Sequence, residues 1–375
     1  MEFTIHHQTL LSVFAVAAVM GAVANKTNFC TMGAVSDWVN MDDKGRLRAW
    51  LLAVAVAMGG VLLLEASGLI NLSTIFPPYR TANFAWLRYL LGGLVFGVGM
   101  TLASGCGNKV LVRIGGGNLK SIVVLIIAAT MAYLMNWTGF YAKAFSSWMS
   151  PLAIDLGATI GAKSQTLGGI IGALLGMDDT AMLQLILGGV VVTALLVFIF
   201  SSLEFRRHRD NILGGVVIGL TVVAGWYLTG SALGVEWKEW AEMADTPPAR
   251  VAVQSFTFIG PMGDTVRYLM NPTDLSLLSF GIVSLVGVIV GSFIYAMSSG
   301  GFRTEWFANG GDFIQHAIGA VLMGIGGALA MGCTIGQGVT GFSTLAVGSM
   351  LTFASIIAGA AATMKYQYWQ MMREA

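Results

Sequence analysis

Two stretches of this sequence, 227 residues apart, repeat one pattern, and this internal repeat constrains the fold more than any other feature. The first covers residues 91–121 and the second residues 318–349. In each, an apolar run with regularly placed glycines ends at a Gly-Cys pair, whose cysteine is Cys106 or Cys333, and a glycine-rich turn leads into another apolar run. Similarity at a fixed spacing indicates one structural unit that occurs twice. The sequence therefore predicts two copies of a helix, a thiol, a turn and a second helix.

The composition places the chain in a lipid bilayer. Hydrophobic residues make up 56% and charged residues 10% of the 375 residues, and apolar runs recur along nearly the whole length. A soluble domain does not need that much apolar sequence, so we expect one all-α polytopic membrane domain over residues 1–375. The net charge of +1, with scattered Lys and Arg, predicts no nucleic-acid partner. Three cysteines, an odd number without a CxxC pair, argue against a disulfide framework and a zinc ribbon. We expect neither a metal nor a cofactor.

Nine apolar segments are long enough to cross a bilayer as helices. They lie at about residues 9–25, 47–66, 86–104, 120–137, 183–201, 212–229, 277–297, 313–331 and 344–363. A further apolar segment, at about residues 166–176, is too short to span and predicts a re-entrant or interfacial piece.

The distribution of basic residues predicts the orientation of the chain, because cytoplasmic loops carry an excess of Lys and Arg. With the N-terminus outside, thirteen of the 20 basic residues fall on the cytoplasmic side. They are Lys26, Lys44, Arg46, Arg48, Lys109, Arg113, Lys120, Arg206, Arg207, Arg209, Arg303, Lys365 and Arg373. The long acidic segment 230–276 then lies outside. We therefore expect a periplasmic N-terminus and a cytoplasmic C-terminus.

An odd number of crossings separates the two repeated units, so we expect them to cross the membrane in opposite directions. The repeat extends towards the N-terminus, where residues 27–33 align with residues 257–263 and place Cys30 opposite Gly260. Many secondary transporters form a substrate site near the bilayer midplane between inverted repeats with broken helices. The predicted parts are one half at residues 1–137, a joining segment at 138–211 and an inverted half at 212–375.

The turns between the broken helices predict a binding site for an anion. Helices that begin at such turns aim free backbone N–H groups, and the positive ends of their dipoles, at one place. The distinctive side chains there are thiols, which are weak donors and soft contacts, so an anion with an exposed sulfur fits better than phosphate or sulfate. The candidate substrate-binding residues are Cys30, Cys106, Cys333, Gly105, Gly107, Gly332, Gly336 and Lys109.

Several of these residues also have a plainer interpretation. A lone cysteine in a membrane protein is usually a small apolar filler, although Cys106 and Cys333 share one place in the two repeated turns. Cys30 has no cysteine as its partner in the repeat. Lys109 also fits a cytoplasmic charge that only sets the orientation, and Glu65, at the end of the second span, fits a charge that extends to the interface.

Three motifs carry a resemblance to a known family, and they are Asn28-Phe29-Cys30, the stretch SGCGNKVLVRIGGGNLKS and the turn Met331-Gly332-Cys333. They resemble the YeeE/YedE family of bacterial sulfur-transport membrane proteins over nearly the whole chain. The resemblance implies uptake of thiosulfate across the bacterial inner membrane, with the ion passed along Cys30, Cys106 and Cys333. It also implies delivery to a small cytoplasmic sulfur carrier of the TusA type. Residues 138–180 and 230–255 match no motif of the family.

We therefore expect a transporter of a small sulfur-containing anion, thiosulfate before others, and not an enzyme. Another sulfur or selenium compound is the first alternative, since some members of the family are linked to such substrates. A membrane thiol enzyme, such as a sulfurtransferase or an oxidoreductase, is the second, and it would need a paired or base-activated cysteine. No CxxC occurs, and the four histidines are far from the cysteines in sequence. A soft-metal channel is the third, although Met-rich ligand spacing is absent around the thiols.

Overall fold

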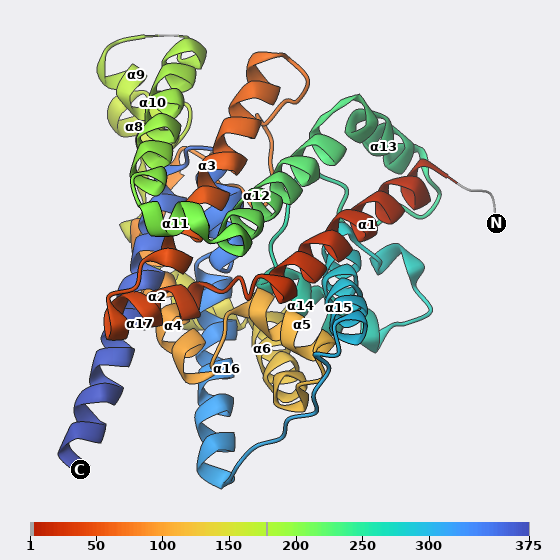
Figure 1. The fold of residues 1–375 in the computed structure, drawn as a ribbon. Coiled ribbons are helices and arrows are strands. Elements are labelled where there is room, and N and C mark those ends of the chain that lie inside the picture. Colours follow the sequence, from red (N-terminus) through yellow and green to blue (C-terminus); the bar gives the residue numbers. More distant parts are fainter. Residues whose placement is uncertain (1–3, 178, 375) are drawn as a thin grey trace.

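The computed structural model of the protein describes residues 4–177 and 179–374, and nearly every element in that part is a helix (Figure 1). Nine of the described helical segments are long and apolar enough to cross a membrane. Their principal helices are α1 (Ile5–Lys26), α3 (Gly45–Ala66), α4 (Trp86–Leu102), α6 (Leu119–Trp137), α10 (Ala181–Phe200), α12 (Arg209–Gly230), α15 (Phe280–Ser298), α16 (Gly310–Leu329) and α17 (Val347–Glu374). The prediction of an all-α polytopic membrane protein is confirmed. Residues 1–3, 178 and 375 of the predicted ranges lie outside the described residues.

Four shorter helical pieces follow breaks in the chain, and they give the two halves the same order of elements. They are α2 (Thr31–Met41), α5 (Gly107–Gly115), α14 (Ile259–Met270) and the π-helix η4 (Gly336–Gly341). The first half runs α1, α2, α3, α4, α5, α6, and the second runs α12, α14, α15, α16, η4, α17, with α13 (Ala232–Met243) inserted. The predicted division into two repeat halves at residues 1–137 and 212–375 stays a prediction, which this order of elements supports. The opposite direction of the halves across a bilayer stays a prediction.

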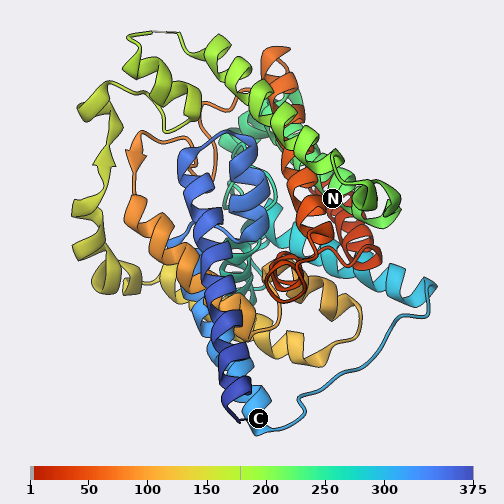
Figure 2. The ribbon, with the colours of Figure 1, turned by 60° about the vertical axis from the view of Figure 1, so that its left-hand side comes forward.

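The packing of the first half recurs in the second. Helix α1 packs along α15, and its counterpart α12 packs along α3. In the same way α4 packs along α17, and its counterpart α16 packs along α6. The two counterparts α4 and α16 also pack against each other (Figure 2). Helices of the two halves therefore interleave.

Glycines bring α4 and α16 into close backbone contact. A Cβ atom at Gly99 would lie 2.7 Å from the carbonyl oxygen of Gly319, and one at Gly319 would lie 2.8 Å from that of Gly99. Gly92 and Gly326 face each other in the same way, at 3.0 and 2.9 Å. The sequence repeat relates Gly92 to Gly319 and Gly99 to Gly326. The two contacts are therefore equivalent positions of the repeat. Small residues allow this approach, and van der Waals packing then stabilises the helix pair in lipid.

The remaining described elements are short, and many of them belong to the segment 138–180, which lies along the outside of the bundle (Figure 2). They are β1 (Asn83–Phe84), η1 (Ala142–Ser146), α7 (Ser147–Met149), η2 (Ser150–Leu152), β2 (Ile154–Asp155), α8 (Leu156–Ile160), α9 (Leu167–Leu174), α11 (Leu203–Arg207) and η3 (Leu275–Leu277). Strands β1 and β2 pair antiparallel.

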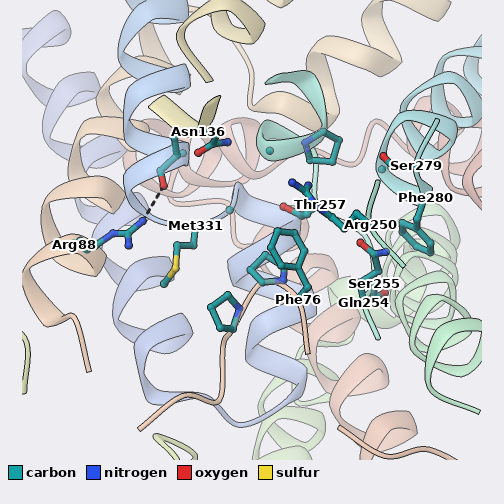
Figure 3. A pocket seen from close by; sticks show the side chains of 18 residues that line it. Phe76, Arg88, Asn136, Arg250, Gln254, Ser255, Thr257, Ser279, Phe280 and Met331 are labelled. Carbon is teal, nitrogen blue, oxygen red and sulfur yellow. Dashed lines mark hydrogen bonds between the residues drawn. The ribbon is translucent and has the colours of Figure 1, made fainter. Parts of the chain in front are cut away.

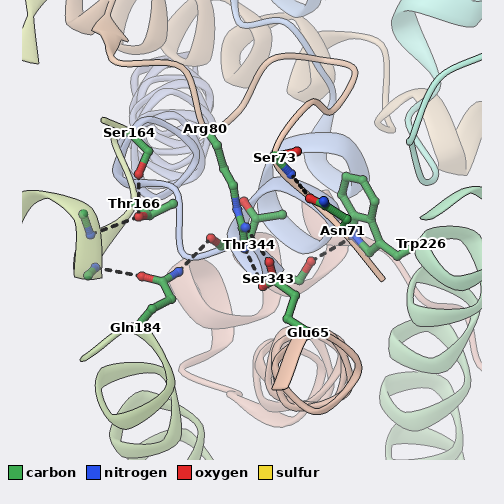
Figure 4. A network of polar contacts seen from close by, with 12 residues as sticks. Glu65, Asn71, Ser73, Arg80, Ser164, Thr166, Gln184, Trp226, Ser343 and Thr344 are labelled. Atoms are coloured by element: carbon green, nitrogen blue, oxygen red, sulfur yellow. Dashed lines mark hydrogen bonds and ion pairs between the residues drawn. The ribbon is translucent and has the colours of Figure 1, made fainter. Parts of the chain in front are cut away.

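Helix α9 occupies the apolar segment predicted as a re-entrant or interfacial piece, and its 8 residues are too few to span. It packs against α10, where Gln184 accepts a hydrogen bond from the amide of Gly168 at 2.8 Å and donates one to the carbonyl of Thr344 at 3.3 Å (Figure 4). The amide of Leu167 donates to the carbonyl of Leu345 at 2.9 Å. The joining segment is thereby attached to the turn that precedes α17.

Candidate functional site

All three cysteines occupy the same local position, the residue just before a helix begins. Cys30 precedes α2, Cys106 precedes α5, and Cys333 precedes the helical segment 334–343 that contains η4. In each case the cysteine carbonyl accepts the first hydrogen bond of the helix from the amide four residues later, at 2.8–3.0 Å. Each thiol also faces the amide three residues later, which belongs to Gly33, Lys109 or Gly336. The expected placement of thiols at helix N-termini is therefore what the structure contains.

The two repeated turns share one backbone geometry. Ser104 and Met331, which are 227 residues apart, have φ angles of 57° and 56° in the left-handed region. The next residues, Gly105 and Gly332, each donate an amide hydrogen bond to the carbonyl five residues earlier at 2.9 Å. This hydrogen bond is the one that closes a Schellman motif at a helix end. The left-handed residue is thus the one before each glycine, and it was not predicted from the sequence.

The thiols of Cys30, Cys106 and Cys333, called here the thiol cluster, are all buried. Cys106 is close enough to both of the others to interact with them electrostatically. The hydroxyl of Thr334, the residue after Cys333, lies beside the Cys106 thiol and bridges the two repeated turns. Cys106 therefore lies between the other two members of the cluster.

Cys333 lies where two helix starts meet. Besides the amides of its own helix, its thiol faces the backbone N–H groups of Phe258 and Ile259, where α14 begins. Two helix N-termini thus converge on one thiol, an arrangement that favours an anion. Tyr79 lies beside the same thiol, and burial raises the pKa of its phenol well above the ordinary value, so the hydroxyl keeps its proton. The site can therefore donate hydrogen bonds from both backbone and side chain.

A cavity of about 270 Å³ opens next to this point, with Gly332 and Thr257 in its wall (Figure 3). Arg88 and Arg250 enter it from different sides. Arg88 lies at the start of α4 and donates to a carbonyl at the end of α16 at 3.0 Å. Two guanidinium groups in one cavity make it attractive for an anion. We call it the arginine cavity.

Arg250 is positioned by an acidic and an aromatic neighbour. Its Nη1 lies 2.5 Å from Oδ2 of Asp264 on α14, and its guanidinium lies 4.4 Å from the centre of the Phe76 ring. Burial raises the pKa of Asp264, while the charge of Arg250 opposes that shift. The ion pair holds the cation in place without leaving the carboxylate unpaired.

Lys109 and Glu65 each have a polar partner in the structure. The Lys109 ammonium donates to Oδ1 of Asn28, just before Cys30 in the chain, although Lys109 itself follows Cys106. It therefore joins the Cys106 turn to the Cys30 loop. Glu65 accepts two hydrogen bonds from Arg80, at 2.6 and 2.7 Å (Figure 4), so it is not a lone interfacial charge.

The predicted glycines lie around the thiol cluster as close-packing positions. A Cβ atom at Gly107 would lie 3.3 Å from the Ile259 side chain, and one at Gly336 would clash with the hydroxyl of Thr257. Gly105 and Gly332 belong to the turns described above. When the residues that directly precede α2 and α14 are matched, Cys30 corresponds to Phe258. The sequence alignment had placed Cys30 opposite Gly260, two residues later. The residue that corresponds to Cys30 in the second half is therefore a phenylalanine and carries no thiol.

Most polar residues around the thiol cluster and the arginine cavity were not predicted from the sequence. They are Asp37, Arg46, Tyr79, Arg88, Arg250, Thr257, Asp264 and Thr334. One signal was present: Cys30 and Cys333 are each followed directly by a threonine. Within the described part of the chain, no three His, Cys, Asp or Glu side chains gather as a metal site.

A bundle of membrane-spanning helices, broken at three thiols and opening to an arginine-lined cavity, defines the class of a membrane transport protein. The chain belongs to the sulphur transport family, whose model matches residues 26–362, and this confirms the resemblance to YeeE/YedE proteins. It is 24% identical over 336 residues to the thiosulfate transporter TsuA of Escherichia coli, covering 88% of this chain and 86% of that protein. It is 26% identical over 356 residues to the thiosulfate transporter TsuA of Spirochaeta thermophila, covering 92% and 94%.

Proposed function

We propose that this protein takes up thiosulfate across the bacterial inner membrane. The observation that carries the proposal is the thiol cluster, in which each of three buried thiols stands at a helix N-terminus. Membership of the sulphur transport family and the names of the two relatives support the same substrate. The protein acts as a transporter and not as an enzyme, so the ion leaves chemically unchanged.

The chemistry of the cluster suits a dianion with one exposed sulfur. Backbone N–H groups at the helix starts bind the oxygens, and protonated thiols give soft, weak contacts to the sulfur. A thiolate would repel the dianion, so the thiols act in their neutral form. Weak binding at several successive places permits passage, because one tight site would retain the ion.

The proposed path begins at the arginine cavity, which we assign to the periplasmic side. From there the ion meets Cys333, then Cys106 and finally Cys30, in the order that their neighbours support. The halves are inverted repeats, the N-terminus is periplasmic and the C-terminus is cytoplasmic, as the basic residues favour. A small TusA-like carrier receives the ion inside the cell.

Uptake of a dianion works against a negative membrane interior. The cost is about 2.3 kcal/mol per charge per 100 mV, so about 4.6 kcal/mol for two charges. Transfer to a carrier on the cytoplasmic side offsets this cost by keeping the internal concentration of free thiosulfate low.

Growth of a bacterial strain that lacks its own sulfate and thiosulfate uptake tests this function. We expect the expressed protein to restore growth with thiosulfate as the sole sulfur source, and an empty vector to give none. Restored growth on sulfate but not on thiosulfate would assign another substrate.

A further inference from the structure

A polar cleft of about 430 Å³ lies near the Cys30 end of the thiol cluster, between α2, α3, α11 and α12. A second cavity, of only about 10 Å³, contains Cys30 and Thr27. Arg46 and Asn211 line both spaces. The small cavity has room for about one water molecule. Arg46 therefore lies between the Cys30 thiol and the cleft and separates the two spaces. We call the region that it fills the passage.

Asp37 holds the Arg46 guanidinium in this position through two hydrogen bonds. Nη2 of Arg46 lies 2.5 Å from Oδ1 of Asp37, and Nε donates to Oδ2. The Asp37 side chain is 5% exposed, while that of Arg46 is 31% exposed. The carboxylate is thus buried on α2, and the guanidinium reaches from α3 across the passage.

The third guanidinium nitrogen lies directly beside the Cys30 turn. Nη1 of Arg46 occupies the space where a side chain on Gly33 would be, and the amide of Gly33 donates to the Cys30 thiol at 3.4 Å. Arg46 interacts electrostatically with Cys30, and so does Lys109 from the Cys106 turn. Cys30 therefore has two cations near it, one from the Cys106 turn and one on the passage to the cleft.

We propose that Arg46 forms a further anion-binding site, at which thiosulfate leaving Cys30 replaces Asp37 on the guanidinium before it enters the cleft. The proposal rests on the proposed function. Thiosulfate carries oxygens that match the planar fork of a guanidinium as a carboxylate does. The Asp37 carboxylate competes with thiosulfate for the Arg46 guanidinium and displaces the ion, so release of the ion is fast. The same exchange moves the guanidinium out of the passage.

Two single variants with opposite expected effects on affinity test this site. Arg46→Gln removes the cation, so binding of labelled thiosulfate to the purified protein should weaken about tenfold or more. Asp37→Asn removes the competitor and leaves the cation, so binding should tighten about tenfold, while uptake into proteoliposomes falls because release is slower. A purely structural ion pair would weaken binding in both variants.

Two further variants keep the test decisive. Asp37→Asn combined with Arg46→Gln leaves a neutral pair and no buried unpaired carboxylate, so it should fold even if Arg46→Gln alone does not. Its binding should be about tenfold weaker than that of the wild type. Lys44→Gln removes an equal charge from the rim of the same cleft, where Lys44 is bonded to Asp42, and should leave affinity and uptake unchanged. Unchanged or weaker binding in Asp37→Asn would overturn the proposal. Loss of uptake in the wild-type protein would instead refute the proposed function.

Discussion

At the scale of single residues, each cysteine combines a weak side-chain donor with the backbone N–H groups of a helix start. A thiol donates a weaker hydrogen bond than a hydroxyl, and its sulfur is polarizable. The backbone supplies the stronger donors, and they are fixed by helix geometry. In the proposed function, the thiols of Cys30, Cys106 and Cys333 contact the sulfur of the ion, and the backbone N–H groups beside them bind its oxygens.

Alanine at Cys106 or Cys333 should abolish thiosulfate uptake, and serine should leave it well below the wild-type rate, because oxygen is a harder and better hydrated contact. Membrane abundance should not change, because a thiol contributes little packing. The measurement is uptake per amount of folded protein. Ser284→Ala, at another fully buried small side chain, is the control and should transport normally. Near-normal uptake in the double alanine variant would return both thiols to the role of apolar fillers.

Lys109→Gln should lower uptake about tenfold while the protein still folds. The ammonium bonds to Asn28 and lies near two thiols, so its loss removes the attraction between two steps of the path. A charge-assisted hydrogen bond contributes about 1.5–3 kcal/mol, which supports that magnitude. Initial uptake rates check it, with the exposed Lys26→Gln as a control of equal charge. Equal rates in both variants would leave Lys109 as an orientation signal only.

The sequence offered the thiols, the glycines and Lys109 as candidates for the site but not its other charged residues, and the reason is physical. The repeated Gly-Cys turns are visible because they depend on local backbone geometry, as at Ser104 and Met331. Ion pairs depend on distant partners, and nothing along the chain indicates that Arg250 meets Asp264. Even the pair Arg46–Asp37, 9 positions apart, requires that α2 turns back on α3.

At the scale of elements, the nine spans were predictable from hydropathy, whereas two of the short helices were not. Helices α2 and α14 carry polar residues, among them Asp37 and Asp264, and so they resemble loops in a hydropathy pattern. They are stable because those carboxylates are paired within the fold. A polar group at membrane depth persists when it is buried in protein or lines a cavity.

Gly99→Val should destabilise the bundle by about 1–3 kcal/mol, because overpacking forces the backbones of α4 and α16 apart. Its Cβ would lie within 2.7 Å of the Gly319 carbonyl oxygen. Thermal unfolding in detergent checks this as a lower midpoint temperature. Gly189→Val on α10 is the matched control, since no atom lies within 4 Å of a Cβ there, and it should melt with the wild type. Equal midpoint temperatures of both variants would show that the contact between α4 and α16 tolerates a side chain at Gly99.

At the scale of the whole molecule, the two halves have the same order of elements, and helices of one half pack against helices of the other. Helix α1 packs against α15, and α12 packs against α3. If all nine candidate spans of the described residues cross the membrane, we expect the termini on opposite sides. Reporter fusions should show a periplasmic N-terminus and a cytoplasmic C-terminus. Activity of both fusions on the same side would contradict the inverted repeat.

Uptake of labelled thiosulfate into proteoliposomes that contain only this protein tests whether the protein is a thiosulfate transporter. We predict accumulation of the intact ion above empty vesicles, little inhibition by excess sulfate and strong inhibition by selenosulfate, because soft contacts at the thiol cluster select the terminal chalcogen. Chemical conversion of the ion, or no uptake above empty vesicles, would contradict a transporter. Equal competition by sulfate would show that charge alone is recognised and that the thiols select nothing.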